Sequence, residues 1–566
     1  MSNKNNTRSR KGKTVVRQTK EMKQPKGKFE RNCDTSDAVY PLPTGSKDND
    51  PSWYVPNATL MKDVASFPFA ARVGRPLTLH YDRFANIESQ QYTPGILIYH
   101  IVPSIGETAR TTDPINLAGS TLFTAMQIES SRNPLYSSSD LIMYLVAITN
   151  VYSLYSWLVR LYGIQYKYSL MNDYMPRYMT QAMGMDYGDV SSHLADLRTG
   201  INIIASKLNS FYLPKGIDYV NRQIFLYESI YTDADNVKAQ YYLYQPKAFW
   251  KWVEGDTADP LTHLQLTPLP SRGGKGNMLV SDILDYADSM IEPLRQSEDI
   301  RIMAADMIRA FGPTQRLEAY PIAETYQVSP VYSPEVLMQF ENAYVYPGAY
   351  SLEGRIGPKT DLNKDAVTQS ISVQANGTFL GGVRSYGAVI GEQQMQAYLD
   401  KQRQSSIILN MHTQEVSPEQ IMVASRLSRD SMEITDVIEV PTNGKSNIVF
   451  KYSVTSTGTE FVCGASLIWL SKVGTTSSYQ FCTDMQTGAF ISEGATVSAS
   501  DAKALMNPTA ELDRTAVLSA FSRHPRIRYW YPYPQSGSGS SMSIEPHPTQ
   551  FMWDFENYTL ISNQEW

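Results

Sequence analysis

The chain has 566 residues, of which 42% are hydrophobic, so a wholly disordered or collagen-like protein is excluded and the length predicts about two to four folded domains. Its formal net charge is only −6, but basic residues are concentrated at the N-terminus, an asymmetry typical of nucleic-acid binding. Charged residues make up 19% of the chain, below the roughly 25% of an ordinary soluble domain, and 37 residues are Tyr. Because interface cores lose charge and gain aromatic residues, this composition favours self-association, with a large Tyr-rich core as the alternative.

Residues 1–50 are predicted to form a disordered arm, because they are polar and cannot bury enough hydrophobic surface to offset the entropy cost of folding. Within the arm, residues 1–31 carry eleven basic and two acidic side chains, a charge of +9 that leaves −15 for residues 32–566. We expect the basic side chains to bind RNA or DNA without reading its sequence, by neutralising phosphates and releasing counterions. The RNA-binding candidates are Lys4, Arg8, Arg10, Lys11, Lys13, Arg17, Lys20, Lys23, Lys26, Lys28 and Arg31. A solubilising tail, a membrane-surface segment and a nuclear signal are the alternatives.

The folded body is predicted to begin near residue 51, where aromatic residues first cluster, and its first part is predicted to be mainly helical. Residues 141–159 contain no charged side chain, a length that would permit a membrane span. The polar residues within this stretch favour a buried core helix instead. Hydrophobic residues three to four positions apart predict helices over 141–161, 191–209 and 217–231, and a pair within 279–311. The candidate N-caps are Ser191 or Ser192, Ser281, Ser297 and Ser333.

The hydrophobic pattern changes from a helical to a strand period in the later part of the chain. Ser417 with Gln420 forms a capping-box pattern that predicts a helix to about residue 428. Beyond it, the hydrophobic runs 437–440 and 448–454 flank Asn443-Gly444, a strong signal for a β-hairpin. Further strands are predicted at 461–470 and 480–491. We interpret residues 431–495 as a small antiparallel sheet of its own.

The C-terminal region contains two aromatic segments. Residues 523–534 mix Arg, Tyr, Trp and Pro, which favours an extended strand packed on a neighbour over a nucleic-acid site. Phe551, Trp553 and Phe555 alternate with polar residues, which is typical of a buried or intersubunit strand.

Enzyme signatures are not found in the sequence, so no catalytic residue, cofactor or metal site is predicted. The glycine-rich stretch 271–277 lacks the spacing of a phosphate-binding loop and is interpreted as a surface turn. The three cysteines indicate no disulfide framework and fit no zinc motif, although a Cys463–Cys482 pair stays open. A hydrolase whose site assembles only in the folded chain is the remaining enzymatic alternative.

The folded body opens with Asn49-Asp50-Pro51-Ser52-Trp53-Tyr54, followed by Ala65-Ser66-Phe67-Pro68-Phe69. These two segments resemble the start of the ordered region in picobirnavirus capsid proteins. The length, the basic arm and the Tyr-rich block 139–250 also look like that family. Partitivirus capsids are similar in plan and form the nearest alternative.

The resemblance implies a viral capsid protein that assembles through dimers into an icosahedral shell and packages double-stranded RNA. It implies a mainly α-helical protein with a smaller β-rich part. The expected divisions are a basic arm (1–50), a helical shell domain (51–345), a protruding region (346–500) and an extended C-terminal arm on the shell or a neighbouring subunit (501–566). We expect location in the virion, assembly in the host cytoplasm, contact with the host membrane during entry, and no enzymatic activity beyond self-cleavage of an N-terminal peptide. A nucleic-acid-binding protein that forms no capsid is the alternative function.

Overall fold

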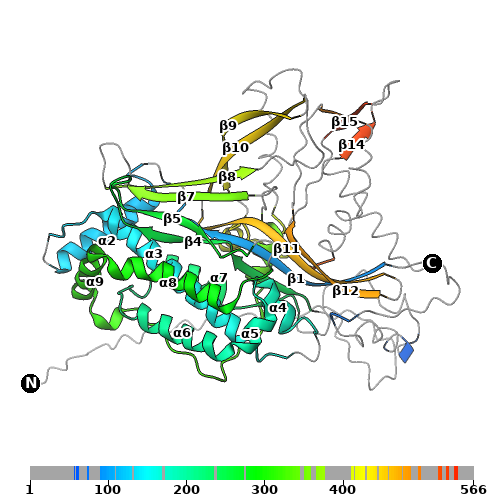
Figure 1. Ribbon diagram of the computed structural model, residues 1–566, viewed down its shortest axis with the longest axis horizontal. Coiled ribbons are helices and arrows are strands. Elements are labelled where there is room, and N and C mark those ends of the chain that lie inside the picture. Colours follow the sequence, from blue (N-terminus) through cyan, green and yellow to red (C-terminus); the bar gives the residue numbers. More distant parts are fainter. Residues whose placement is uncertain are drawn as a thin grey trace, which may run out of the picture. The chain divides into compact units, whose positions relative to one another are not determined.

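The structure, a computed structural model, is shown in Figure 1. It describes residues 57, 59–60, 62, 73–75, 90–106, 108, 110–130, 133–168, 172–234, 239–272, 276–343, 350–358, 365–375, 409–413, 415–427, 430–442, 445–456, 458–473, 476–485, 495–498, 520–524, 531–534 and 541–545. The chain forms two compact units, Met1–Pro68 and Phe69–Trp566. In the first unit, the Asn57 side chain accepts hydrogen bonds from the backbone N–H groups of Thr59 and Leu60. The elements described below belong to the second unit.

The central helix of the second unit is α3, Ser138–Gly163, as the uncharged stretch predicts. It begins at a capping box, in which Ser137 accepts from the Asp140 N–H group and the Asp140 carboxylate accepts from the Ser137 N–H group. The helix is long and hydrophobic enough to cross a membrane, but 83% of its most hydrophobic window is buried inside the protein. It contacts the helices α2 (Pro114–Ser130), α6 (Leu194–Leu208) and α7 (Asp218–Glu228). The prediction of a core helix is confirmed.

The other predicted helices are also present, and the differences concern where they begin. The remaining helices are α4 (Arg177–Ala182), α5 (Tyr187–Ser192), α8 (Val280–Gln296), α9 (Glu298–Phe311), α10 (Pro334–Asn342) and α12 (Pro418–Ala424). The predicted caps Ser333 and Ser417 are confirmed, because each side chain accepts a backbone N–H at the start of its helix. The predicted caps at 191–192 and Ser281 are wrong, since α6 begins after His193 and α8 after Leu279.

The first sheet joins strands that are far apart in sequence. Its order is β12-β11-β1-β3-β2-β6, with β1 antiparallel to β11 and parallel to β3. The strands are β1 (Gln90–Pro103), β2 (Tyr231–Thr232), β3 (Tyr241–Pro246), β6 (Val331–Tyr332), β11 (Glu460–Val473) and β12 (Thr476–Met485). Strand β3 lies in a block that the sequence predicts to be helical. All six of its residues are buried, so the alternation that marks a half-exposed strand is missing from the sequence.

The second sheet is antiparallel and has the order β4-β5-β7-β8-β10-β9. Its strands are β4 (Ala248–Val253), β5 (His263–Pro268), β7 (Tyr350–Pro358), β8 (Val367–Ala375), β9 (Asp430–Thr442) and β10 (Lys445–Ser456). Thr442 pairs with Lys445, which confirms the predicted hairpin. The prediction that 431–495 forms a sheet of its own is wrong, because β9 and β10 join the second sheet whereas β11 and β12 join the first. Helices and sheets are thus both prominent, with more strand than the sequence predicts.

A third sheet contains the strands β13 (Ala495–Ser498), β15 (Ser541–Glu545) and β14 (Tyr531–Pro534), in the order β13-β15-β14. The Pro- and Tyr-rich segment therefore contributes a strand, β14, in agreement with the predicted extended conformation. The predicted strand around Phe551 and Phe555 lies outside the described residues.

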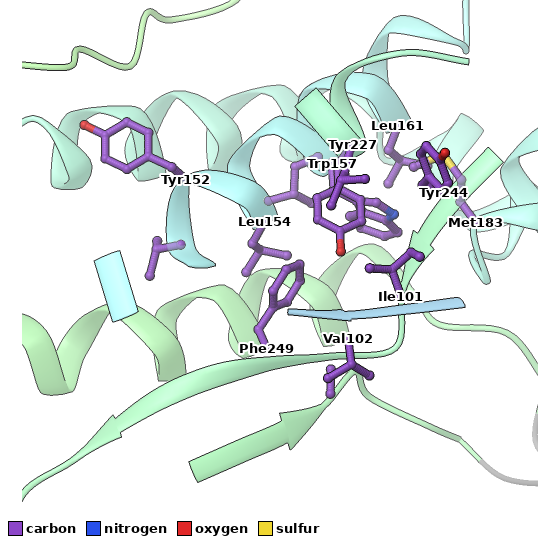
Figure 2. Close-up of a cluster of buried hydrophobic side chains, with 14 of the residues drawn as sticks. Ile101, Val102, Tyr152, Leu154, Trp157, Leu161, Met183, Tyr227, Tyr244 and Phe249 are labelled. Atoms are coloured by element: carbon purple, nitrogen blue, oxygen red, sulfur yellow. The ribbon is translucent and has the colours of Figure 1, made fainter. Parts of the chain in front are cut away.

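The hydrophobic core lies between α3 and the strands β1, β3 and β4 (Figure 2). Trp157 is at its centre and is fully buried, with Phe249, Tyr227 and Ile101 in the same cluster. The Trp157 indole N–H donates to Gln245 Oε1 at 2.8 Å, and the Gln245 amide donates in turn to the Met183 carbonyl at 2.9 Å. The indole that enters the centre of this core thus has a hydrogen-bond partner, as burial of a polar atom requires.

We expect the free energy of unfolding to fall as the pH is lowered from about 6.5 toward 3, because His100 is partly buried on β1. Burial, reinforced by Lys247, lowers the pKa of His100 from 6.5 to about 3. Between these values the unfolded chain binds a proton that the folded chain does not, which costs up to about 1.4 kcal/mol per pH unit. Urea denaturation at a series of pH values measures this loss. His100→Gln should flatten the profile in this range. A wild-type slope retained in His100→Gln would contradict the assignment.

Candidate functional site at the C-terminal junction

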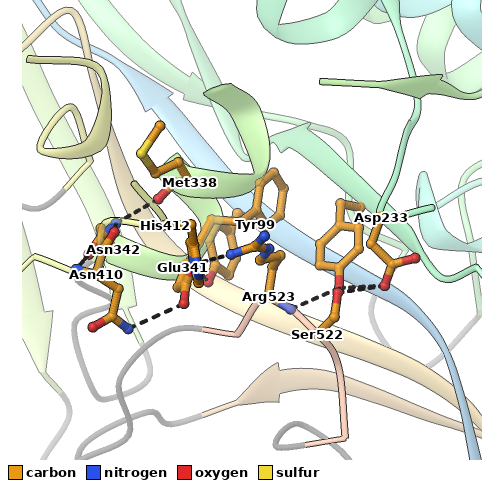
Figure 3. Close-up of polar contacts among 11 residues, drawn as sticks. Tyr99, Asp233, Met338, Glu341, Asn342, Asn410, His412, Ser522 and Arg523 are labelled. Atoms are coloured by element: carbon orange, nitrogen blue, oxygen red, sulfur yellow. Dashed lines mark hydrogen bonds and ion pairs between the residues drawn. The ribbon is translucent and has the colours of Figure 1, made fainter. Parts of the chain in front are cut away.

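The C-terminal segment 520–524 is fastened to the body by a polar cluster that we name the C-terminal junction. It consists of Asp233, Tyr242, Glu341, Asn410, His412, Phe521, Ser522 and Arg523 (Figure 3). These residues come from β3, from the loop before it, from the end of α10 and from two later segments of the chain. No short sequence motif connects them, which is why sequence reasoning missed the site.

The first half of the junction is built on Tyr242 of β3. The buried Phe521 ring packs edge-on against the Tyr242 ring, with centroids 5.9 Å apart. The Arg523 N–H donates to the Tyr242 hydroxyl at 3.1 Å, and Ser522 Oγ donates to Asp233 Oδ2 at 2.7 Å. Burial, followed by the nearby Asp233 carboxylate, raises the pKa of Tyr242, so its hydroxyl stays protonated and can donate to Asp233. This half therefore anchors the segment with one aromatic contact and a closed hydrogen-bond network.

The second half of the junction is built on Glu341, near the end of α10, whose side chain is 12% exposed. Its Oε2 accepts from Arg523 Nη1 at 2.7 Å and lies 2.6 Å from His412 Nε2, while its Oε1 accepts from Asn410 Nδ2 at 3.3 Å. Hydrogen bonds to an ionised carboxylate are roughly twice as strong as neutral ones. One side chain thus holds two segments, 409–412 and 520–524, against the same helix end.

A second polar centre is built on a fully buried carboxylate and links the start of β11 to the helices. The Glu460 carboxylate, with no exposed side-chain surface, accepts from Arg222 at 2.6 Å and from Arg426 at 3.1 Å. Arg222 also donates to Gln339 Oε1 at 3.0 Å. Burial alone would raise the pKa of Glu460, but the two guanidinium groups outweigh it and lower the pKa below its usual value. We name Arg222, Arg426 and Glu460 the buried ion cluster.

The described residues show no group of three or more His, Cys, Asp or Glu side chains that could hold a metal ion. The buried Cys463 thiol donates to the His100 carbonyl at 3.5 Å and takes part in no disulfide, so the Cys463–Cys482 pair that the sequence left open is not formed. The eleven predicted RNA-binding residues of segment 1–31 lie outside the described residues, so their placement stays a prediction. Both polar centres hold separate chain segments together, and this arrangement is structural in character.

The comparison with protein families identifies the chain. The sequence profile of the family described as picobirnavirus capsid protein matches residues 53–526. The chain belongs to this family. The resemblance in the opening of the body is therefore confirmed, and the protein is a structural component of the virion.

Two relatives support the assignment. The capsid protein precursor of Human picobirnavirus (strain Human/Thailand/Hy005102/-) is 26% identical over 430 residues, which cover 75% of this chain and 75% of the relative. The X-ray crystallographic structure of the picobirnavirus capsid matches with a TM-score of 0.66 and 18% identity, covering 88% of this chain and 93% of that one. The fold is thus that of a picobirnavirus capsid subunit, and membership in a capsid family implies self-assembly into a shell.

Proposed function

We propose that the chain assembles through dimers into a closed icosahedral shell that packages double-stranded RNA, with the basic N-terminal arm as the RNA contact. Membership in the capsid family supports assembly into a shell. The observation that carries the RNA contact is the charge of +9 within residues 1–31, against −15 for the rest of the chain.

The physical basis of RNA binding is counterion release. Basic side chains that neutralise phosphates release condensed cations, so binding is independent of sequence and weakens steeply with salt. The acidic body repels phosphate and discourages RNA from coating it elsewhere. Segment 1–31 contains a single aromatic residue, Phe29, so base stacking contributes little to the contact.

Deletion of residues 1–45 is expected to leave particle assembly intact and to reduce the RNA that co-purifies with the particles. The deleted segment carries all eleven candidate basic residues, so the slope of log affinity against log salt should become shallower. Filter binding across a salt series and the ratio of absorbance at 260 and 280 nm measure the two effects. A full-length variant with these eleven residues changed to Gln serves as the control for chain length and should behave like the deletion.

The outcomes separate the proposal from its alternatives. Equal salt slopes for the deletion and the full chain would overturn the RNA contact. Folded protein that forms no closed particles by negative-stain microscopy, across salt and pH, would favour a nucleic-acid-binding protein that forms no capsid. The two polar clusters described above hold chain segments together, and neither of them supports the hydrolase alternative.

We also propose the division into a shell part (51–345), a protruding part (346–500) and a C-terminal arm (501–566), with one refinement. Strand β11 pairs along its length with β1, so we assign β11 and β12 to the shell part. The C-terminal junction supports an arm that begins by packing on its own subunit. Assembly in the host cytoplasm, membrane contact during entry and release of an N-terminal peptide complete the proposal, and the word "precursor" in the relative's name is consistent with the last of these.

A further inference from the structure

The two six-stranded sheets each have a long strand that is paired on one side only, within the part of the chain that the structure describes. Strand β12 pairs only with β11, and β9 pairs only with β10. The unpaired N–H and C=O groups of such an edge are a template for a further strand. Proteins normally block an exposed edge with charged residues, proline or a covering segment.

The two edges differ in how they are protected. Strand β9 carries one proline, four acidic residues and no basic residue, namely Asp430, Glu433, Asp436, Glu439 and Pro441. Strand β12 has the sequence TSSYQFCTDM, with Asp484 as its single charge and no proline. By its own residues, the β9 edge is therefore protected against pairing with another strand, whereas β12 carries little such protection.

The β12 edge is also held firmly in place. The Tyr479 ring stacks on Tyr178 of α4 with centroids 3.9 Å apart, and the Tyr479 hydroxyl donates to the Gly74 carbonyl at 2.8 Å. Tyr174 packs edge-on against the same ring at 5.9 Å. A preorganised edge loses little conformational freedom when another strand pairs with it.

We propose that β12 pairs antiparallel with β12 of a second copy across a two-fold axis, so that the first sheet continues from one subunit into the next. This inference rests on the proposed assembly through dimers and names one of its contacts. When a two-fold axis runs perpendicular to the sheet, the residue of β12 next to the axis lies opposite the same residue of the second copy. The registers with the longest overlap are centred on Gln480 or Phe481.

Charge favours this pairing for β12 and opposes it for β9. In the register centred on Gln480, Asp484 lies opposite Thr476 of the second copy. In the register centred on Phe481 it lies opposite Ser478, so no two acidic residues face each other in either register. When β9 pairs with itself over its full length, Asp436 stands opposite its own mate and Glu433 opposite Glu439, which is destabilising. A second copy of β12 therefore meets no repulsion between like charges at this edge, which a second copy of β9 would meet at its own.

Substitution of Gln480 with Lys tests the pairing, because both registers bring the two introduced lysine side chains onto opposing or diagonally adjacent positions. We expect the dimer Kd to rise at least about tenfold, measured by sedimentation equilibrium of the full chain. The control is Thr435→Lys, which adds the same charge in the middle of β9 and should leave the Kd unchanged. An equal effect of the two substitutions, or none for Gln480→Lys, would overturn the proposal.

Cross-linking gives a second measurement that does not depend on loss of binding. Gln480→Cys, in a Cys33→Ser background, stands opposite its own mate in one register and opposite Cys482 of the second copy in the other. Opposed residues of an antiparallel pair lie roughly 4.5–5.5 Å apart between Cα atoms, within the range for a disulfide. Mild oxidation should therefore give a reducible dimer on a denaturing gel, and Thr435→Cys should not.

Hydrogen exchange of β12 distinguishes the occupants of the edge. The amides of β12 should be protected in the dimer and exchange faster when it dissociates. Dimers or particles that form without the cross-link and without this protection would overturn the β12 contact alone. If the protein does not associate at all, both the proposed assembly and the β12 contact would be overturned. If deletion of residues 546–566 exposes the β12 amides of the monomer, the chain's own C-terminal segment covers the edge and the proposal fails.

Discussion

Replacing Glu460 with Gln is expected to lower the free energy of unfolding by about 3–5 kcal/mol, because it leaves two partly buried guanidinium groups without their buried carboxylate. The Glu460 side chain has no exposed surface and accepts from both Arg222 and Arg426. Gln keeps the shape of the side chain and one acceptor oxygen, so the loss reports mainly on charge. Urea denaturation at pH 7 measures it.

A matched substitution on the surface separates burial from ion pairing as such. Glu324 is 76% exposed and lies 3.9 Å from Arg198, so Glu324→Gln should change the unfolding free energy by less than about 0.5 kcal/mol. Similar small values for both variants would contradict the importance of the buried ion cluster.

The same cluster adds to the acid sensitivity of the fold. The pKa of Glu460 is lower in the folded chain than in the unfolded chain. The stabilisation is therefore complete above the unfolded pKa, near 4.5, and is lost as the pH falls through the folded pKa. This loss lies at the acidic end of the range in which His100 acts, and Glu460→Gln should remove it.

Replacing Trp157 with Ala is expected to lower the free energy of unfolding by about 3–5 kcal/mol. The side chain is fully buried where α3 meets the strands, and its indole N–H holds Gln245 Oε1 at 2.8 Å (Figure 2). The substitution opens a cavity and also leaves a buried amide oxygen without its donor, and both changes destabilise the fold. Thermal and urea denaturation of the two proteins measure the difference.

Two further variants test this explanation. Trp157→Phe fills most of the cavity but removes the donor, so it should cost less than Trp157→Ala, about 1–3 kcal/mol. Leu135→Ala removes a side chain that is 98% exposed and should be close to neutral. A Trp157→Ala protein as stable as Leu135→Ala would show that α3 is not the centre of the core.

The elements predicted correctly are those whose signals are local. The long uncharged stretch predicted α3, Ser333 and Ser417 predicted the starts of α10 and α12, and Asn443-Gly444 predicted the β9–β10 hairpin. Each signal depends on residues that are close together in the chain. Where a strand is buried on both sides, as β3 is, the hydrophobic period carries no such signal and the prediction failed.

The charge asymmetry of the chain, the burial of its central helix and the resemblance to a capsid family can all be read from the amino-acid sequence. Which strands share a sheet is known only from the folded chain, in which β11 lies beside β1 rather than beside β10. The folded chain also brings Glu341 to Arg523 and Glu460 to Arg222, contacts that span 182 and 238 positions. Local patterns fix local conformation, whereas pairing across such separations depends on how all the buried surfaces fit together at once.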